Sequence, residues 1–170
     1  PAFFKVLRHS TLFPVFLKLH GRRVLVVGGG PMAASKAASL VAAGADVSVV
    51  APETCEAIQQ LPVAIARRPF RESDLAGAWL VVAAAPPAVN RAVTEAASAR
   101  CVFVNAVDDP AHATAYAASV VTRGPVTLAI STSGQAPALA ALLREAIDDW
   151  LPPDLEAWVA DAVRQREEWK

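Results

Sequence analysis

A run of three glycines, set between an apolar strand pattern and a helical pattern, constrains this chain more than any other feature. Residues 24–27 are Val-Leu-Val-Val, a continuous apolar run typical of a parallel strand buried on both faces. Residues 31–43 then place alanine, leucine and valine at helical spacing. The glycines therefore lie where a strand passes into a helix, as in a dinucleotide-binding turn. The alternative is that they end a buried strand for packing reasons alone.

The spacing of the small residues assigns each one a role. We expect Gly28 to make the tight turn, Gly30 to let the backbone approach a pyrophosphate, and Ala33 to keep the helix close to the strand. The N–H groups of the first helical turn, which Pro31 and Met32 open, would face the phosphates together with the positive end of the helix dipole. Gly28, Gly30, Pro31 and Met32 are therefore predicted to bind the cofactor.

A second apolar run, residues 47–50, ends in Ala-Pro-Glu at 51–53. An acid that binds a ribose is expected near this point, about twenty residues past the turn. Pro52 and Glu53 are thus added to the predicted cofactor site, although Glu53 lies slightly late and its recognition of the ribose stays open. No arginine lies beside it, which favours NAD over NADP.

Strand and helix patterns alternate through the first hundred residues, and this predicts an α/β fold with a Rossmann-like, doubly wound parallel sheet. The expected strands are 13–18, 23–27, 47–50, 63–67, 79–84 and 102–104, and the expected helices are 31–43, 54–60 and 88–99. A turn signal at 122–125 then separates two strand-like runs, 116–121 and 126–130, which predicts a small β-hairpin. An amphipathic helix follows as far as Pro152-Pro153, and a last helix starts at Asp154.

We divide the chain into a Rossmann-like NAD-binding domain (1–114), a dimerisation hairpin and helix (115–150), and the start of a helical region (151–170). The hairpin and the two amphipathic helices cannot bury their own apolar faces within so few residues. A homodimer is the expected solution, with packing back onto the same chain as the alternative.

Composition excludes several classes of protein. Apolar residues make up 54% of the 170 residues and charged residues 19%, which is incompatible with disorder. Sixteen basic and sixteen acidic residues balance, so neither a nucleic-acid nor a membrane partner is expected. Two cysteines, Cys55 and Cys101, are expected to be buried fillers in a reducing cytoplasm. No uninterrupted apolar run reaches the roughly eighteen residues of a spanning helix, so we expect a soluble cytoplasmic protein.

Six motifs, in this order, resemble one known family. They are Phe-Pro-Val-Phe-Leu-Lys-Leu at 13–19, Val-Val-Gly-Gly-Gly at 26–30 with Lys36, Val-Val-Ala-Pro-Glu at 49–53, Val-Asn-Ala-Val-Asp-Asp-Pro at 104–110, Leu-Ala-Ile-Ser-Thr-Ser-Gly at 128–134, and Pro-Ala-Leu-Ala-Ala-Leu-Leu-Arg-Glu at 137–145. Over nearly the whole chain they resemble the N-terminal module of siroheme synthase and its free-standing relatives, the precorrin-2 dehydrogenase/sirohydrochlorin ferrochelatases.

The resemblance implies oxidation of precorrin-2 to sirohydrochlorin with NAD as hydride acceptor, possible insertion of ferrous iron into the product, and one aspartate that serves both steps. By its motif that aspartate is Asp108, a candidate base on the loop after the strand at 102–104. A turn with a side-chain cap is the alternative for Asp108, while Asp109 is assigned a structural role.

The tetrapyrrole substrate is an octacarboxylate, so hydrogen-bond donors should line its groove. Asn105, Thr132 and Ser133 are the predicted substrate-binding residues. A buried amide that satisfies backbone groups is equally compatible with Asn105, and ordinary helix caps explain the two hydroxyls. A basic cluster, Arg67, Arg68 and Arg71, is expected to be a solvated face.

The chain departs from the family pattern at residues 85–87, where it has Ala-Pro-Pro in place of Thr-Asp-Asp. This loss of polar groups leaves two alternatives open: a non-catalytic NAD-sensing dimer, and a chelatase without dehydrogenase activity. His20 and His112 occupy unrelated positions, so we predict no metal-binding residues.

Overall fold

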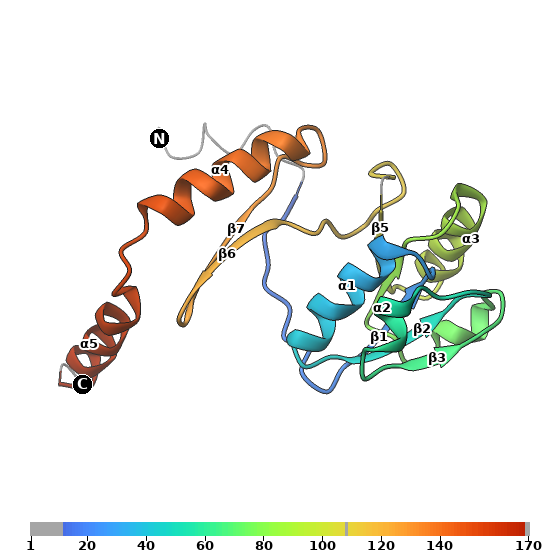
Figure 1. Cartoon of the computed structure of the whole chain (residues 1–170), viewed down its shortest axis with the longest axis horizontal. Helices are drawn as coiled ribbons and strands as arrows, with labels where there is room; N and C mark the ends of the chain where they lie inside the picture. Colours follow the sequence, from blue (N-terminus) through green and yellow to red (C-terminus); the bar gives the residue numbers. More distant parts are fainter. Residues whose placement is uncertain (1–11, 108, 169–170) are drawn as a thin grey trace. The chain divides into compact units, whose positions relative to one another are not determined.

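The computed structural model of the protein describes residues 12–107 and 109–168, and these fall into two compact units (Figure 1). The first unit extends to Tyr116 and the second begins at Ala117.

Five parallel strands form the sheet of the first unit, in the order β3-β2-β1-β4-β5. The first strand, β1, lies at the centre of the sheet. Strands β2 and β3 follow on one side of it, and β4 and β5 lie on the other side. The strands are β1 (Arg23–Val27), β2 (Asp46–Val50), β3 (Ala64–Ala66), β4 (Leu80–Ala83) and β5 (Phe103–Ala106). The connecting elements are α1 (Pro31–Ala42), α2 (Glu56–Gln59), the 3-10 helix η2 (Glu72–Leu75) and α3 (Pro87–Ser98). The predicted Rossmann-like parallel sheet is confirmed.

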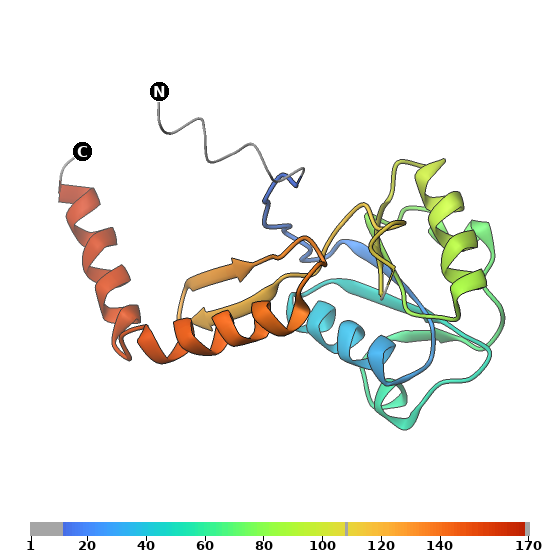
Figure 2. The same cartoon turned by 90° about the horizontal axis from the view of Figure 1, so that it is seen from above.

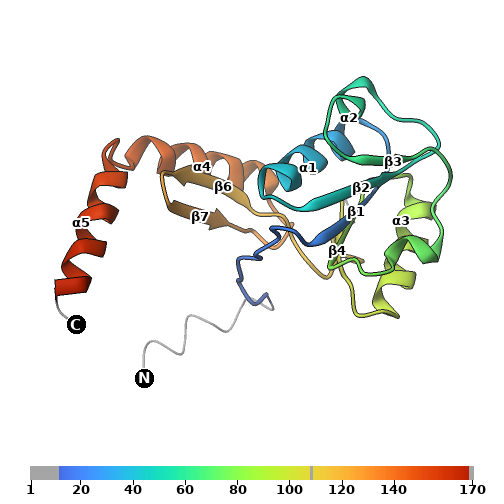
Figure 3. The same ribbon diagram turned by 90° about the horizontal axis from the view of Figure 1, so that it is seen from below.

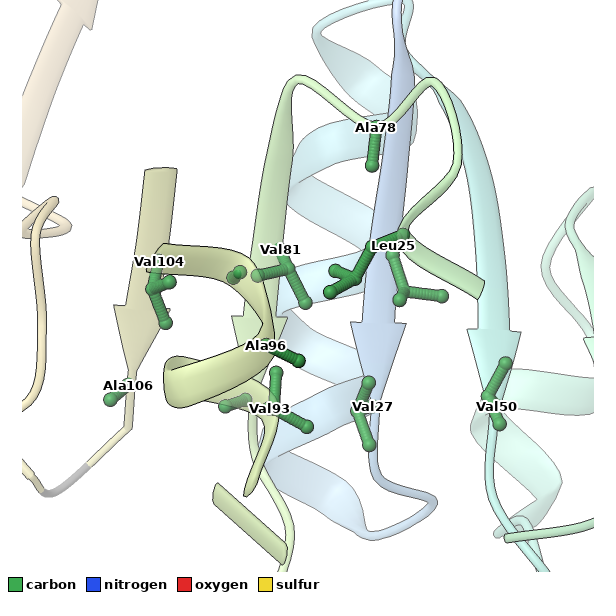
Figure 4. Close-up of a cluster of buried hydrophobic side chains, with 12 residues drawn as sticks. Leu25, Val27, Val50, Ala78, Val81, Val93, Ala96, Val104 and Ala106 are labelled. Carbon is green, nitrogen blue, oxygen red and sulfur yellow. The ribbon is translucent and has the colours of Figure 1, made fainter. Parts of the chain in front are cut away.

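Successive side chains along each buried strand point to opposite faces of the sheet, and this produces two separate apolar cores, one on each face. Leu25 and Val27 of β1 point to the face that α3 covers, where they join Val81, Val93 and other buried residues (Figure 4). Val26 points to the opposite face, where α1 contributes Ala33, Ala34 and Ala37. Figure 3 shows α1 and α3 on the two sides of the sheet. Because both faces of β1 are covered, this strand is fixed in place and so is the turn that follows it.

The prediction of a strand at 13–18 was wrong. Residues 12–18 contain no strand in the structure, and Phe13 and Phe16 are 87% and 70% exposed. An apolar run becomes a strand only where a neighbouring strand can pair with its backbone, and the sheet ends at β3 and β5 without reaching this segment.

The basic cluster at 67–71 is also not a uniformly solvated face. Arg68 donates two hydrogen bonds to the carboxylate of Asp74, at 2.9 and 2.6 Å, and the backbone N–H of Arg71 donates a third at 2.8 Å. Asp74 is only 7% exposed. The Arg68 hydrogen bond, assisted by the Arg71 N–H, lowers the pKa of Asp74 below its usual value, although burial acts in the opposite direction. This ion pair anchors η2, which takes the place of a full helix between β3 and β4.

The second unit packs α4 (Pro137–Trp150) against an antiparallel hairpin of β6 (Ser119–Arg123) and β7 (Val126–Ile130), as Figure 2 shows. Arg123, at the hairpin turn, donates to the backbone oxygens of Leu151 and Asp148, both at 3.0 Å, and to Asp148 Oδ1 at 2.6 Å. The predicted hairpin and helix are thus present, and α5 (Leu155–Glu168) follows them.

None of the helices within residues 12–107 and 109–168 has the length and apolar character that crossing a membrane requires.

We predict that Asp74→Asn lowers the free energy of unfolding by about 1–3 kcal/mol at pH 7, because a charge-assisted hydrogen bond is lost. The folded-state pKa of Asp74 lies below its unfolded value, so its contribution is present above pH ~4 and disappears as the pH falls through the folded pKa. Urea denaturation at pH 7 and at pH 3 measures both values, and the difference between variant and wild type should shrink at the lower pH.

As a control, Asp46→Asn changes an exposed carboxylate at the start of β2 and should alter stability by less than about 0.5 kcal/mol. An equal loss for Asp74→Asn at both pH values would show that the carboxylate charge is not the source of the stabilisation.

Candidate functional site

A cavity of about 880 Å³ opens at the carboxyl ends of β1, β2 and β4. Since the chain order reverses beside β1, this is the place where open parallel sheets bind their ligands. Its volume is within the range of small-molecule and cofactor sites. Its lining residues come from the turns after these strands and from the segment before η2: Val27–Gly30, Val50–Cys55, Pro69, Phe70, Ala84–Pro86 and Val89.

Two glycines allow the turns around this cavity to touch. Gly28 has a φ of +133°, and a β-carbon there would lie 2.1 Å from the carbonyl oxygen of Ala84. A β-carbon on Gly29 would lie 1.8 Å from the carbonyl oxygen of Glu53. The tight-turn role predicted for Gly28 agrees with this geometry. The sequence pattern assigned no role to Gly29, although it is the middle glycine of the run.

Gly30 differs from its two neighbours because it faces open space. Its φ is −85°, which any residue adopts, and a β-carbon there would meet no atom within 4 Å. Gly30 is the N-cap of α1 and has no side-chain cap; Pro31 has no N–H group, and those of Met32 and Ala33 have no intrahelical acceptor. Open space in front of free N–H groups and a positive helix end suits the pyrophosphate of a dinucleotide.

The other predicted cofactor residues are distributed unequally around the cavity. Pro52 and Glu53 line it and are exposed, whereas Pro31 and Met32 lie in the first turn of α1 and do not line it. The N–H of Cys55 donates to the carbonyl oxygen of Gly29 at 2.8 Å, which ties the turn after β2 to the glycine turn.

The turn after β4 and the start of α3 form an apolar wall of the cavity, built from Ala84, Ala85 and Pro86 of the turn and Val89 of the helix. The backbone N–H of Ala85 donates to the side-chain oxygen of Asn90 at 2.9 Å. Phe70 and Pro69 also line the cavity. The sequence interpretation identified neither Phe70 nor Asn90, because an aromatic residue before a loop and an amide within a helix have no distinctive spacing.

The predicted base, Asp108, lies outside the residues that the structure describes, but the residues after it are described. The ring atom Nδ1 of His112 lies 2.8 Å from Oδ1 of the Asp109 carboxylate, within hydrogen-bond distance. The Tyr116 hydroxyl donates to the carbonyl oxygen of Pro110 at 2.8 Å. These contacts agree with the structural role expected for Asp109.

The predicted substrate-binding residues lie in different units. Asn105 belongs to β5, and its Nδ2 donates to the carbonyl oxygen of Ala115 at 3.0 Å, which is the backbone-satisfying role left open above. Thr132 and Ser133 belong to the second unit, before α4. The Thr132 hydroxyl accepts from the N–H of Ala136 at 3.2 Å, and Ser133 has a φ of +55°. Their roles in substrate binding stay predictions.

Among the residues described, no three histidine, cysteine, aspartate or glutamate side chains group together in a way that could hold a metal ion.

Two family models match successive parts of the chain. Residues 15–119 match the family described as putative NAD(P)-binding, and residues 123–149 match the one described as sirohaem biosynthesis protein central. Siroheme synthase of Photorhabdus laumondii is 41% identical over 162 residues, and that of Pseudomonas putida is 42% identical over 166 residues. Each alignment covers 92% of this chain, but 34% and 35% of the relatives, so the chain spans about a third of their length.

Among solved structures, SirC, a precorrin-2 dehydrogenase, aligns with a TM-score of 0.73 and 27% sequence identity. That alignment covers 88% of this chain and 76% of the other. The similarity to SirC therefore concerns the fold as well as the sequence. The chain therefore belongs to the putative NAD(P)-binding family, as the module of that family found in siroheme synthases.

Proposed function

We propose that this protein binds NAD across the turn at 28–30 and oxidises precorrin-2 to sirohydrochlorin. The observation that supports this most directly is the open space at Gly30, in front of the N-terminus of α1 and within the cavity at the switch point of the sheet. The similarity to siroheme synthases and to the dehydrogenase SirC supports the choice of substrate.

In this proposal, the segments around the cavity have different roles. The N–H groups of the first turn of α1 bind the pyrophosphate, and Gly28 and Gly29 keep the neighbouring turns close enough to enclose it. When bound, NAD supplies the hydride acceptor for the oxidation. Asp108 takes the proton that the macrocycle releases when the hydride leaves, a role that rests on its motif.

The preference for NAD over NADP is assigned to Glu53. Glu53 lines the cavity past the end of β2, the region where a ribose-binding acid is expected, and this supports the assignment. A carboxylate accepts hydrogen bonds from the ribose hydroxyls and repels the 2′-phosphate of NADP.

The first prediction from this proposal concerns Gly30→Asp, which should lower the affinity for NAD by about thirtyfold or more, roughly 2 kcal/mol. Aspartate is favoured at an N-cap and meets no protein atom here, so the fold should be retained, but its charge occupies the space of the pyrophosphate. Calorimetric titration with NAD and NADP measures both affinities, and the wild type should prefer NAD.

The matched control is Gly30→Asn, which has the same size and also caps helices, but is neutral. It should bind NAD more weakly than the wild type and more tightly than the aspartate variant. If all three proteins bind NAD equally, the pyrophosphate does not lie at residue 30.

A second prediction is that Asp108→Ala abolishes turnover of precorrin-2, measured as NADH absorbance in the presence of both substrates, because the proton acceptor is removed. Asp109→Asn is the matched control on the same loop. Its carboxylate is engaged by His112, so this change should leave the rate within about threefold of the wild type. Normal turnover by Asp108→Ala would remove Asp108 from the mechanism.

We further propose that the protein is a cytoplasmic homodimer. Support comes from α4, which buries only Ala140 and leaves Leu139, Leu142, Leu143 and Trp150 exposed, with Trp150 at 80%. We also propose, from the family resemblance, that the protein inserts ferrous iron into sirohydrochlorin. Incubation of the protein with both substrates in the absence of NAD tests this activity.

The dimer proposal predicts that Leu142→Glu weakens self-association by at least about tenfold, because a charge would be buried in the contact. Sedimentation equilibrium measures this, with Ala160→Glu, an exposed position of α5, as a control that adds the same charge. A wild-type protein that sediments as a monomer at high concentration would contradict the proposal.

A further inference from the structure

Asn90 is a buried amide that the proposed chemistry does not use. It lies in the second turn of α3, on the cavity side of the sheet, and is only 4% exposed. Its Oδ1 accepts a hydrogen bond of 2.9 Å from the backbone N–H of Ala85, which lines the cavity. Burying an amide costs free energy unless it is hydrogen-bonded, and the Ala85 N–H satisfies the oxygen of this one.

The turn that Asn90 holds is also fixed from the other side. The N–H of Ala84 donates to the carbonyl oxygen of Val27 at 2.8 Å, and the carbonyl oxygen of Ala84 lies where a β-carbon of Gly28 would be. Residues 84 and 85 are therefore clamped between the end of β1 and the side chain of Asn90. Any displacement of Ala85 would be passed through Ala84 to Gly28.

The sequence of this turn explains why a side chain from inside the helix is needed. Pro86 is the N-cap of α3 and Pro87 follows it, so neither has an N–H group and no side chain caps the helix. The N–H groups of Val89 and Asn90 donate to the carbonyl oxygen of Pro86, at 2.9 and 3.0 Å. Without Asn90, the N–H of Ala85 would lose its acceptor beside an apolar wall.

We propose that Asn90 is a positioning residue for the cofactor, acting through Ala85 on the turn at 84–86 and on Gly28. This inference rests on the proposed binding of NAD. Because the N–H groups of Ala84 and Ala85 are already bonded and two prolines follow, this wall meets the cofactor through apolar contact. The wall thus packs on a ring of the dinucleotide, while its phosphates stay at α1.

The test compares three variants in NAD titration, in thermal unfolding and in hydrogen exchange of the Ala85 amide. Asn90→Ala should weaken NAD binding by about tenfold and abolish protection of the Ala85 amide. Asn90→Asp keeps an acceptor at the N-terminal end of α3 and should stay within about threefold of the wild type, with protection retained.

Thr94→Val is the matched control, because Thr94 is also buried, one turn further along α3, and its hydroxyl has no hydrogen-bond partner among the described residues. It should change neither NAD affinity nor Ala85 protection. If Asn90→Ala does not fold, the aspartate variant decides: tight NAD binding with a protected Ala85 amide supports the proposal, and loss of either overturns it.

The remaining outcomes separate this inference from the proposed function. A wild type that does not bind NAD overturns both. A wild type that binds NAD, with Asn90→Ala binding equally well, overturns only the positioning role. Weaker binding by Asn90→Ala without rescue by aspartate shows a merely structural contribution and likewise overturns it.

Discussion

The contact between backbones at the ends of β1, β2 and β4 is the constraint on which the rest of this site depends. The carbonyl oxygens of Ala84 and Glu53 lie 2.1 and 1.8 Å from the positions that β-carbons of Gly28 and Gly29 would take, which leaves no room for a side chain at either residue. Strands in one sheet lie at fixed spacing, so these turns can approach only by omitting side chains. The fully buried residues of β1 prevent the glycine turn from moving outward to relieve a clash. Both glycines are therefore requirements of packing, and Gly30 alone leaves space for a ligand.

Much of the first unit could be predicted from sequence because its central strands are buried on both faces. The valine-rich segments 24–27 and 47–50 identify such strands without knowledge of their neighbours. The same logic failed at 13–18, where a largely apolar run has no strand beside it. Gly29 and Asn90 were missed for a related reason, since their importance comes from residues 53 and 85, whose proximity only the fold creates.

The structure also changes the meaning of Ala85-Pro86-Pro87. From the sequence alone, this segment appeared to lose the polar groups that would face a cofactor. In the structure its one usable N–H group, that of Ala85, is satisfied by Asn90, and both prolines need no acceptor. The two sides of the cavity are consequently different in kind: the glycine turn lines one side and leads into α1, whose first N–H groups lack an intrahelical acceptor, and the turn after β4 offers an apolar surface on the other. This division permits dinucleotide binding without the missing hydroxyl and carboxylates.

The described residues around the loop after β5 are joined to one another by hydrogen bonds. The N–H of Val104 donates to the Thr114 hydroxyl at 2.8 Å, and the N–H groups of Thr114 and Ala115 return to the carbonyl oxygen of Val104. Asp109 and Tyr116 add contacts to His112 and Pro110. All these bonds join residues other than 108, so they can persist when residue 108 is replaced. Replacing Asp108 therefore tests the proposed base without deleting any contact that these described residues make with one another.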